Sequence, residues 1–479
     1  MKNRLVLLAM LEICFTGAQA AWGQWSSDPS MNLPLADKIN NDQVQPKVKL
    51  LPNDQWYVSW FGADPNSPPP IGYDVYVQRL SRGGVERFRH DGRLVADLSN
   101  SSTEDYGLDV DSEGNALLAF LDTREGSNPQ VTAAKIAARG KSLWGQRGVQ
   151  LTSGSSFHAA PKIAGTRDGG AVVAWTNDSS VVLQKLDRHG HPLWGKGVVF
   201  SESGYNYSLA DLHAADDESM IVSWVRDSGF FSDRQLRANK LSASGKRLWG
   251  KNSVALFDQG SLQFGAFPYF IPDGSGGAVF SWYTSRPALQ CFAQHVRADG
   301  SEAFPHNGAA GSTDTSNVRV EPSVSYRAKT DQTFLYWTEE DSFQIVNGVY
   351  GQKFSGEGMP EWNPNGLVIV PLGADTQSFV ENVQVGSGSL VLWVDSPGYG
   401  LSTIQATRLN GRGKVVCRQF AVSSAPANKY GLSVAKARSG LTAVAWADDR
   451  IGNNSIYIQN VNPDCSLGQA DESKDKDEE

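Results

Sequence analysis

The sequence predicts an all-β protein, a β-propeller of eight four-stranded blades. Three observations predict this fold class. A strand motif that ends in an aromatic residue recurs at a nearly constant spacing, a second aromatic residue recurs in a turn, and glycine and tryptophan are abundant. The chain of 479 residues contains 48 Gly and 14 Trp. A motif that recurs at a constant spacing is typical of propellers and solenoids, so a single domain can use most of the chain.

One repeat is clearest in residues 161–201. Four short runs in it, PKIAG, GAVVAW, SVVLQKL and GVVFS, have the length and the Val, Ile and Ala content of strands. A DGG turn joins the first two runs, and the Gly-bearing turn DRHGHPLWG joins the last two. The repeat therefore predicts a four-stranded antiparallel unit.

The second strand of this unit recurs along the chain and ends each time in an aromatic residue: Trp60, Phe120, Trp175, Trp224, Trp282, Trp337, Trp393 and Trp446. The turn between the third and fourth strands also carries a recurrent aromatic residue, at Trp144, Trp194, Trp249 and Trp362, with Phe304 in the matching place. A four-stranded unit cannot bury both faces alone, so we expect the units to stack in a closed ring with these aromatics between blades. Eight copies predict eight blades; seven is the alternative if one copy is degenerate.

The two ends of the repeat region predict how the ring closes. The last copy runs into Pro463 after its third strand, whereas residues 21–48 have the form of a turn, a fourth strand and a crossover. We therefore expect a strand around Asn32 to Ala36 to complete the last blade and cover its edge.

The N-terminal residues 1–20 have the features of a secretory signal peptide: a positive start, an apolar run over residues 5–15, and Ala18-Gln19-Ala20 as a cleavage site. The run is too short to span a membrane, and no later stretch approaches twenty apolar residues. We expect the propeller over residues 21–468, an acidic disordered tail over residues 469–479, and a secreted, periplasmic or cell-surface location.

Three cysteines remain after the expected cleavage. Cys417 and Cys465 fall in the last two repeats near strand ends, and they are the candidate disulfide for an oxidising compartment. Cys291 lies in an apolar strand and is expected to be a buried, inert thiol.

The phrase GGAVVAW, followed by a strand ending in Gln-x-Leu and by G-x-x-LWG, resembles a repeat of bacterial secreted β-propeller proteins. The resemblance covers Trp22 to about Gly468, and it implies a fold and a compartment. The turn DRHGHPLWG also has a weaker similarity to the tryptophan-bearing turn of quinoprotein-type propellers. Neither resemblance implies a catalytic residue.

Acidic residues recur just after the strand-ending aromatics, at Asp122, Asp178, Asp227, Glu339, Asp395 and Asp448, with Arg124 and Arg450 following two of them. They are candidates for a ligand face formed by the loops from second to third strand and from fourth strand to the next blade, here called the loop face. In one interpretation each acid only caps its turn by accepting from a backbone N–H two residues on. In the other they form a sugar site together with exposed loop aromatics, namely Tyr205, Tyr207, Phe230, Phe231 and Tyr399. A ring spread over eight blades is too wide for Ca²⁺, which needs converging oxygens.

No catalytic motif is found: the sequence has no H-E-x-x-H, no G-x-S-x-G and no P-loop. No metal or cofactor is indicated, and the acidic pI of about 5.5 argues against a nucleic-acid partner.

The favoured hypothesis is a monomeric, non-catalytic binding or scaffold propeller that recognises a protein or glycan through the loop face. The alternative is a secreted polysaccharide hydrolase or lyase that uses acids on that face. Carboxylates or a histidine converging in one deep pocket would favour the enzyme, and a shallow, evenly polar channel mouth would oppose it.

Overall fold

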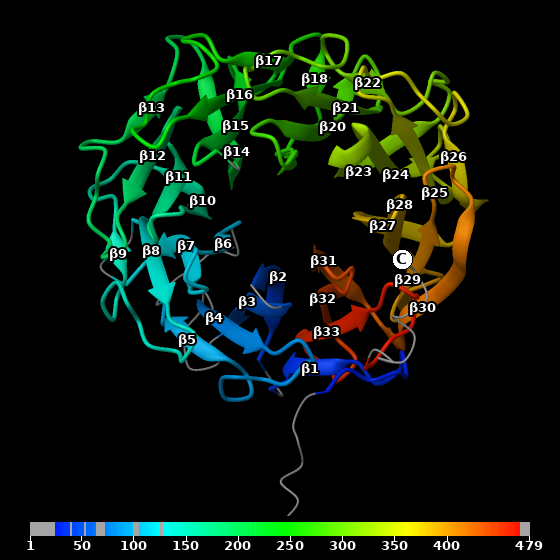
Figure 1. The fold of residues 1–479 in the computed structure, drawn as a ribbon, viewed down its shortest axis with the longest axis horizontal. Coiled ribbons are helices and arrows are strands. Elements are labelled where there is room, and N and C mark those ends of the chain that lie inside the picture. Colours follow the sequence, from blue (N-terminus) through cyan, green and yellow to red (C-terminus); the bar gives the residue numbers. More distant parts are fainter. Residues whose placement is uncertain are drawn as a thin grey trace, which may run out of the picture.

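The computed structural model describes residues 24–38, 41–51, 54–63, 72–98, 105–124, 126, 128–215 and 217–469. The predicted signal peptide and the predicted tail beyond Gln469 lie outside these ranges. Eight antiparallel sheets stand around a central opening (Figure 1). The eight-bladed propeller is therefore confirmed, and the seven-bladed alternative is wrong.

Blades 1 to 4 each use four consecutive strands, ordered from the channel outwards. Their strands are β2 (Gln43–Leu51), β3 (Gln55–Ala63), β4 (Tyr73–Leu80) and β5 (Arg93–Ala96); β6 (Gly107–Val110), β7 (Ala116–Asp122), β8 (Gln130–Ile136) and β9 (Val149–Gln150); β10 (His158–Gly165), β11 (Ala171–Asn177), β12 (Ser180–Leu186) and β13 (Val198–Phe200); β14 (Asn206–Ala214), β15 (Met220–Asp227), β16 (Gln235–Leu241) and β17 (Val254–Phe257).

Blades 5 to 8 follow the same order with two exceptions: the inner strand of blade 5 is split, and the outermost strand of blade 8 comes from the other end of the chain. Their strands are β18 (Ser261–Leu262) with β19 (Phe270–Pro272), β20 (Ala278–Arg286), β21 (Cys291–Val296) and β22 (Ala309–Ala310); β23 (Val318–Arg327), β24 (Gln332–Glu340), β25 (Asn347–Phe354) and β26 (Leu367–Gly373); β27 (Thr376–Val385), β28 (Gly388–Ser396), β29 (Ser402–Leu409) and β30 (Val415–Ala427); β31 (Lys429–Lys436), β32 (Thr442–Asp448), β33 (Ser455–Val461) and β1 (Leu33–Ala36). Within the described ranges the single helical element is the short η1 (Ala328–Thr330), and no helix there is long and apolar enough to cross a membrane.

The N-terminal strand closes the ring as predicted. Strand β1 pairs antiparallel with β33, with Leu33 opposite Ile458 and Ala36 opposite Ile456. In Figure 1 the blue β1 lies beside the red β33. Blade 8 therefore has four strands, and β33 is not left as an unpaired edge strand where the two ends of the chain meet.

The strand-ending aromatics form the contacts between blades. All eight are at most 4% exposed, and they belong to the clusters of buried apolar side chains that run between neighbouring sheets. Of the turn aromatics, Trp144, Trp249 and Phe304 are buried, whereas Trp194 and Trp362 are half-buried. The aromatic residues that recur in the sequence are thus the residues that recur in the packing between blades.

Each turn between the third and fourth strands packs against the corresponding turn of the neighbouring blade. Each has a residue of positive φ, which is glycine in seven blades: Gly84, Gly140, Gly190, Gly245, Gly300, Gly358 and Gly413. A Cβ at Gly300 would lie 2.7 Å from Trp249, and one at Gly84 would lie 2.8 Å from Trp25. Glycine is needed here because the aromatic ring of the preceding blade packs directly on the turn.

The eighth turn carries Cys465, with a φ of 69°, where the other turns have glycine. Cys465 forms a disulfide with Cys417 of β30, which confirms the predicted pair. The bond joins blade 7 to blade 8 at the seam where the turn of blade 7, residues 410–414, offers no aromatic side chain. Cys291 is buried and has no disulfide partner, and burial raises the pKa of its thiol.

We expect the double variant Cys417→Ala/Cys465→Gly to be more stable than Cys417→Ala/Cys465→Ala by about 1 kcal/mol, because a left-handed backbone costs a residue with a Cβ roughly 1–2 kcal/mol. Urea unfolding of the two variants, beside the oxidised wild type, measures the difference. An alanine variant as stable as the glycine variant would show that position 465 does not require this conformation.

Candidate functional site in the central channel

One residue from each blade occupies the same level of the central channel. Each of seven pairs with the residue just before the strand-ending aromatic of its own blade: Lys47, Gly107, Lys162, Asp211, Ser323, Glu381 and Ser433. In blade 5, Tyr269 precedes Phe270, which pairs with Phe280, and so takes the matching place. We call these eight positions the channel ring.

Backbone bulges shape this ring. In six of the inner strands the pairing register shifts just before the ring residue. In five of them, the residue two positions earlier has positive φ: Gln45, Ala160, Glu321, Phe379 and Gly431. A bulge of this kind re-aims the side chain that follows it. The bulges therefore set the direction of the channel side chains independently of the regular strand alternation.

The channel ring surrounds a cavity of about 710 Å³. Its wall is polar at the level of the ring and includes apolar side chains beyond it, among them Leu50, Ile163 and Leu212. A concave site of this size with a few converging polar groups is the usual form of a ligand-binding pocket.

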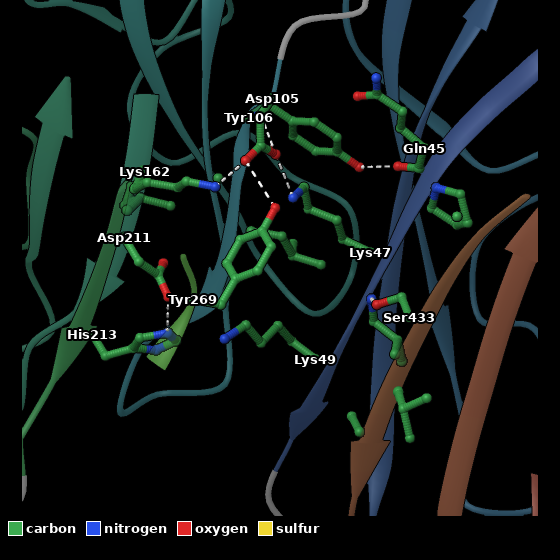
Figure 2. Close-up of a pocket in the computed structure, with 18 of the residues that line it drawn as sticks. Gln45, Lys47, Lys49, Asp105, Tyr106, Lys162, Asp211, His213, Tyr269 and Ser433 are labelled. Carbon is green, nitrogen blue, oxygen red and sulfur yellow. Dashed lines mark hydrogen bonds and ion pairs between the residues drawn. The ribbon is translucent and has the colours of Figure 1, made fainter. Parts of the chain in front are cut away.

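Two lysines donate hydrogen bonds to one carboxylate inside the cavity (Figure 2). Gly107 brings no side chain to the ring at blade 2, where a Cβ would lie 2.7 Å from Ile163 N, and the carboxylate of this blade is that of Asp105. Lys47 Nζ donates to Asp105 Oδ1 at 2.6 Å, and Lys162 Nζ donates to Asp105 Oδ2. Tyr269 Oη reaches the same carboxylate from blade 5, at 3.4 Å from Oδ2. The cluster thus ties blades 1, 2, 3 and 5 together at one point.

The charges of this cluster stabilise one another. Burial favours the neutral acid, but Lys162 and Lys47 together hold the pKa of Asp105 well below its usual range. Burial likewise opposes the charge of Lys162, yet Asp105 raises its pKa above the ordinary value. Asp105 and Lys162 are therefore ionised at neutral pH. Burial lowers the pKa of Lys47; the charge of Asp105 opposes this and that of Lys162 adds to it.

Two more acids line the same cavity. Asp211 accepts from His213 Nε2 at 2.9 Å and from the backbone N–H of Phe270 at 3.2 Å. Glu381, on blade 7, accepts from the hydroxyl of Ser323 at 3.0 Å. Burial raises the pKa of Glu381 to about 7; the bond from Ser323 opposes this rise and the charge of Glu321 adds to it. The cavity therefore holds ionised carboxylates together with one that is protonated near neutral pH.

Exposed aromatic side chains gather on the loop face beside this cavity. The split in the inner strand of blade 5 leaves residues 263–269 as a loop, in which Phe264, Phe267 and Tyr269 are 64%, 42% and 60% exposed. The ring of Phe264 lies 5.0 Å from that of Phe230, on the loop between β15 and β16. Arg234 supports this loop: its Nη2 donates to Ala266 O at 3.2 Å, and its guanidinium lies 5.2 Å from the ring of Phe267.

The aromatics named from the sequence are partly confirmed as exposed. Phe230, Phe231 and Tyr399 are 72%, 89% and 90% exposed. The expectation for Tyr207 is wrong, because this residue is buried and donates to Glu202. Tyr205 is half-buried under the guanidinium of Arg226, 3.3 Å from the ring centroid.

The acids predicted for the loop face are each bonded within their own blade. Three accept from the backbone N–H two residues on, as turn caps do: Asp122 from Arg124 at 3.0 Å, Asp227 from Gly229 at 3.0 Å and Asp448 from Arg450 at 3.3 Å. The other three accept from the inner edge of their blade: Asp178 from Phe157 N, Asp395 from Gln377 Nε2 and Glu339 from Arg319 Nη2. Arg124 and Arg450 also donate from Nε to the acids they follow. The structure thus does not bring these acids together, and a role toward a ligand stays a prediction.

The channel residues are not among those predicted from the sequence. One signal was present: a Pro-Lys pair lies within the inner strand of both blade 1 and blade 3, at Pro46-Lys47 and Pro161-Lys162. Repeated lysines on strands that border a channel could have been proposed as a site. The partners Asp105 and Tyr269 had no comparable signal, because they come from other blades.

Asp448 also contributes to stability through a neighbouring tryptophan. Trp446 Nε1 donates to Asp448 Oδ2 at 2.8 Å, whereas Trp393 Nε1 is buried with no partner among the described residues. We expect Trp446→Phe to lower the free energy of unfolding by about 1–3 kcal/mol more than Trp393→Phe, because only the first leaves a buried carboxylate short of a donor. Denaturant titration of both variants measures this, and equal losses would contradict it.

No protein-family model matches the chain, and no curated protein matches it. Solved structures with similar architecture include the polysaccharide lyase Uly1, at 10% identity and a TM-score of 0.45 over 88% of this chain and 90% of that one. They also include a protein of unknown function from Dyadobacter fermentans, at 8% identity and a TM-score of 0.42 over 90% and 98% of the two chains. A third is the Penicillium chrysogenum α-L-arabinanase complexed with arabinobiose, at 11% identity and a TM-score of 0.37 over 93% and 98%. At these identities and scores, no residue of this chain takes a role from them.

Proposed function

We propose that the protein binds a glycan on its loop face and holds part of it in the central channel. The observation that carries this proposal is the combination of a cavity of about 710 Å³, lined by Lys47, Lys162, Asp105 and Tyr269, with exposed aromatic rings beside it on the same face. Sugars present apolar C–H faces and many hydroxyl groups. Aromatic rings suit the first, and charged donors and acceptors suit the second.

The proposed location is outside the cytoplasm, as the signal sequence predicts. The disulfide between Cys417 and Cys465 supports this, because such bonds persist in oxidising compartments. The proposed partner is therefore a polysaccharide of the cell envelope or the surroundings.

The double variant Phe264→Ala/Phe267→Ala tests the aromatic contribution. After a glycan array has identified a ligand, we expect its affinity to fall about tenfold, since 1.4 kcal/mol corresponds to that factor. Calorimetry measures the change. The matched control is Leu143→Ala/Leu193→Ala, which removes two exposed apolar side chains from the turns on the opposite face. Unchanged affinity in the phenylalanine variant would contradict the proposed surface.

Hydrolysis of the bound glycan is the second candidate function. Asp105, Asp211, Glu381 and His213 share the cavity, and carboxylates or a histidine that converge in one pocket are what a hydrolase needs. Glycosidases pair a protonated acid with an ionised carboxylate. Here Glu381 would protonate the leaving oxygen, and Asp105 or Asp211 would activate water.

If the protein is a hydrolase, its rate falls as pH rises through about 7, because Glu381 must be protonated to act as the acid. We expect Glu381→Gln to lower the release of reducing ends at least about 100-fold while glycan binding is retained. Glu357→Gln, an exposed acid in a turn on the opposite face, is the control. A bound glycan that yields no new reducing ends with the wild type would leave binding as the function. A Glu381→Gln variant of full activity would exclude this acid.

A further inference from the structure

A second cavity, of about 590 Å³, lies far from the channel at the turns of blades 1 and 2. Its lining comes from the connection between β4 and β5, from the turn of blade 2 between β8 and β9, and from Lys38 in the connection between β1 and β2. Five permanently cationic side chains line it: Lys38, Arg87, Arg89, Arg93 and Arg139. We call this cavity the basic cleft.

Most of this positive charge is not neutralised by the propeller. Among the described residues, no acid lies in ion-pair contact with Arg87, Arg89, Arg93 or Arg139, and Lys38 is 3.9 Å from Asp91. Such a concentration of cations is unexpected in a chain whose formal net charge is −8. Unpaired arginines lining a cleft are suited to carboxylate or other oxyanion ligands.

His90 is paired with acids and adds no net positive charge to the cleft. Its Nδ1 faces Glu86 at 3.1 Å and its Nε2 faces Asp37 at 2.9 Å. The bond with Glu86, opposed by burial and aided by the bond with Asp37, raises the pKa of His90 to about 9. Both ring nitrogens therefore donate hydrogen bonds at neutral pH. His90 and the neighbouring Asp37 and Asp91 thus form an ion-pair cluster rather than a metal site.

The described chain ends close to this cleft. Gln469 Nε2 donates to Gly83 O at 3.2 Å, and Gly83 stands four residues before Arg87. Residues 470–479 follow, with six acids and two lysines among them. Ten residues can span up to roughly 33 Å, and the four residues from Gly83 to Arg87 span at most about 13 Å. The acidic segment is therefore attached within reach of the basic cleft.

We propose that the basic cleft binds acidic polypeptide, and that its occupant is the acidic segment 471–479 of the same chain. Two independent observations favour this occupant: the opposite charges, and the attachment point beside the cleft. Each exposed ion pair is worth only about 0–1 kcal/mol. Several pairs act together here, however, and the covalent link gives the segment an effective concentration in the millimolar range. The proposal is independent of glycan binding, because the basic cleft shares no lining residue with the channel cavity.

Carbodiimide cross-linking of the full chain, read by mass spectrometry, tests the proposal. The reagent joins a carboxylate to an amine, and Lys38 is the only lysine of the cleft. We expect the segment 471–479 to link to Lys38 at least about tenfold more than to Lys251, an exposed lysine of blade 4, because the bound segment has a high local concentration at the cleft. The link to Lys38 should disappear in about 1 M NaCl, where the screening length is about 3 Å.

The variant Arg87→Glu/Arg89→Glu should lose the Lys38 link, since it reverses two charges of the cleft. The control Arg412→Glu/Arg418→Glu changes the net charge equally at exposed arginines of blade 7 and should keep the link. Circular dichroism establishes that both variants are folded. Equal linking of the segment to Lys38 and Lys251, or a Lys38 link that survives in Arg87→Glu/Arg89→Glu, would overturn the proposal.

Discussion

The pairing of β1 with β33 is the contact on which the rest of the structure depends. The last sheet of the ring lacks a fourth strand of its own, and here the missing strand comes from the opposite end of the chain. The same seam is reinforced by Trp25, which packs on the turn of blade 1 at Gly84, while the neighbouring seam is held by the Cys417–Cys465 bond. Without closure, the inner strands of blades 8 and 1 would not face a common channel.

Closure converts a repeated fold into a single site. Every inner strand places one residue at the same level of the channel. The backbone is therefore similar in each blade, and the chemistry of the site depends on which side chain each blade supplies. Blade 2 supplies Gly107, which has no side chain, and its Asp105 accepts from both Lys47 and Lys162. Blade 5 interrupts its inner strand, and the resulting loop carries Tyr269 to the same carboxylate. The channel site thus arises where two blades depart from the repeat.

The sequence was sufficient for features that repeat or that lie at the chain ends. The strand-ending aromatics gave the number of blades, the incomplete last copy gave β1, and the cysteines of the last two repeats gave the disulfide. The channel site could not be predicted in the same way. The direction of its side chains depends on bulges at residues such as Ala160 and Phe379. The residues that bond to the Asp105 carboxylate lie as far as 57 or 164 positions from it in the chain. The burial of Tyr207 was missed because its hydroxyl finds Glu202 only once β14 is placed.

A crystal structure with a bound oligosaccharide tests most directly whether the closed ring forms a glycan-binding channel. We expect sugar density in the cavity, within hydrogen-bonding distance of Lys47, Lys162 or Tyr269, with a sugar face against the ring of Phe264 or Phe267. Density confined to the outer edges of the blades or to the opposite face, with an empty channel, would contradict it.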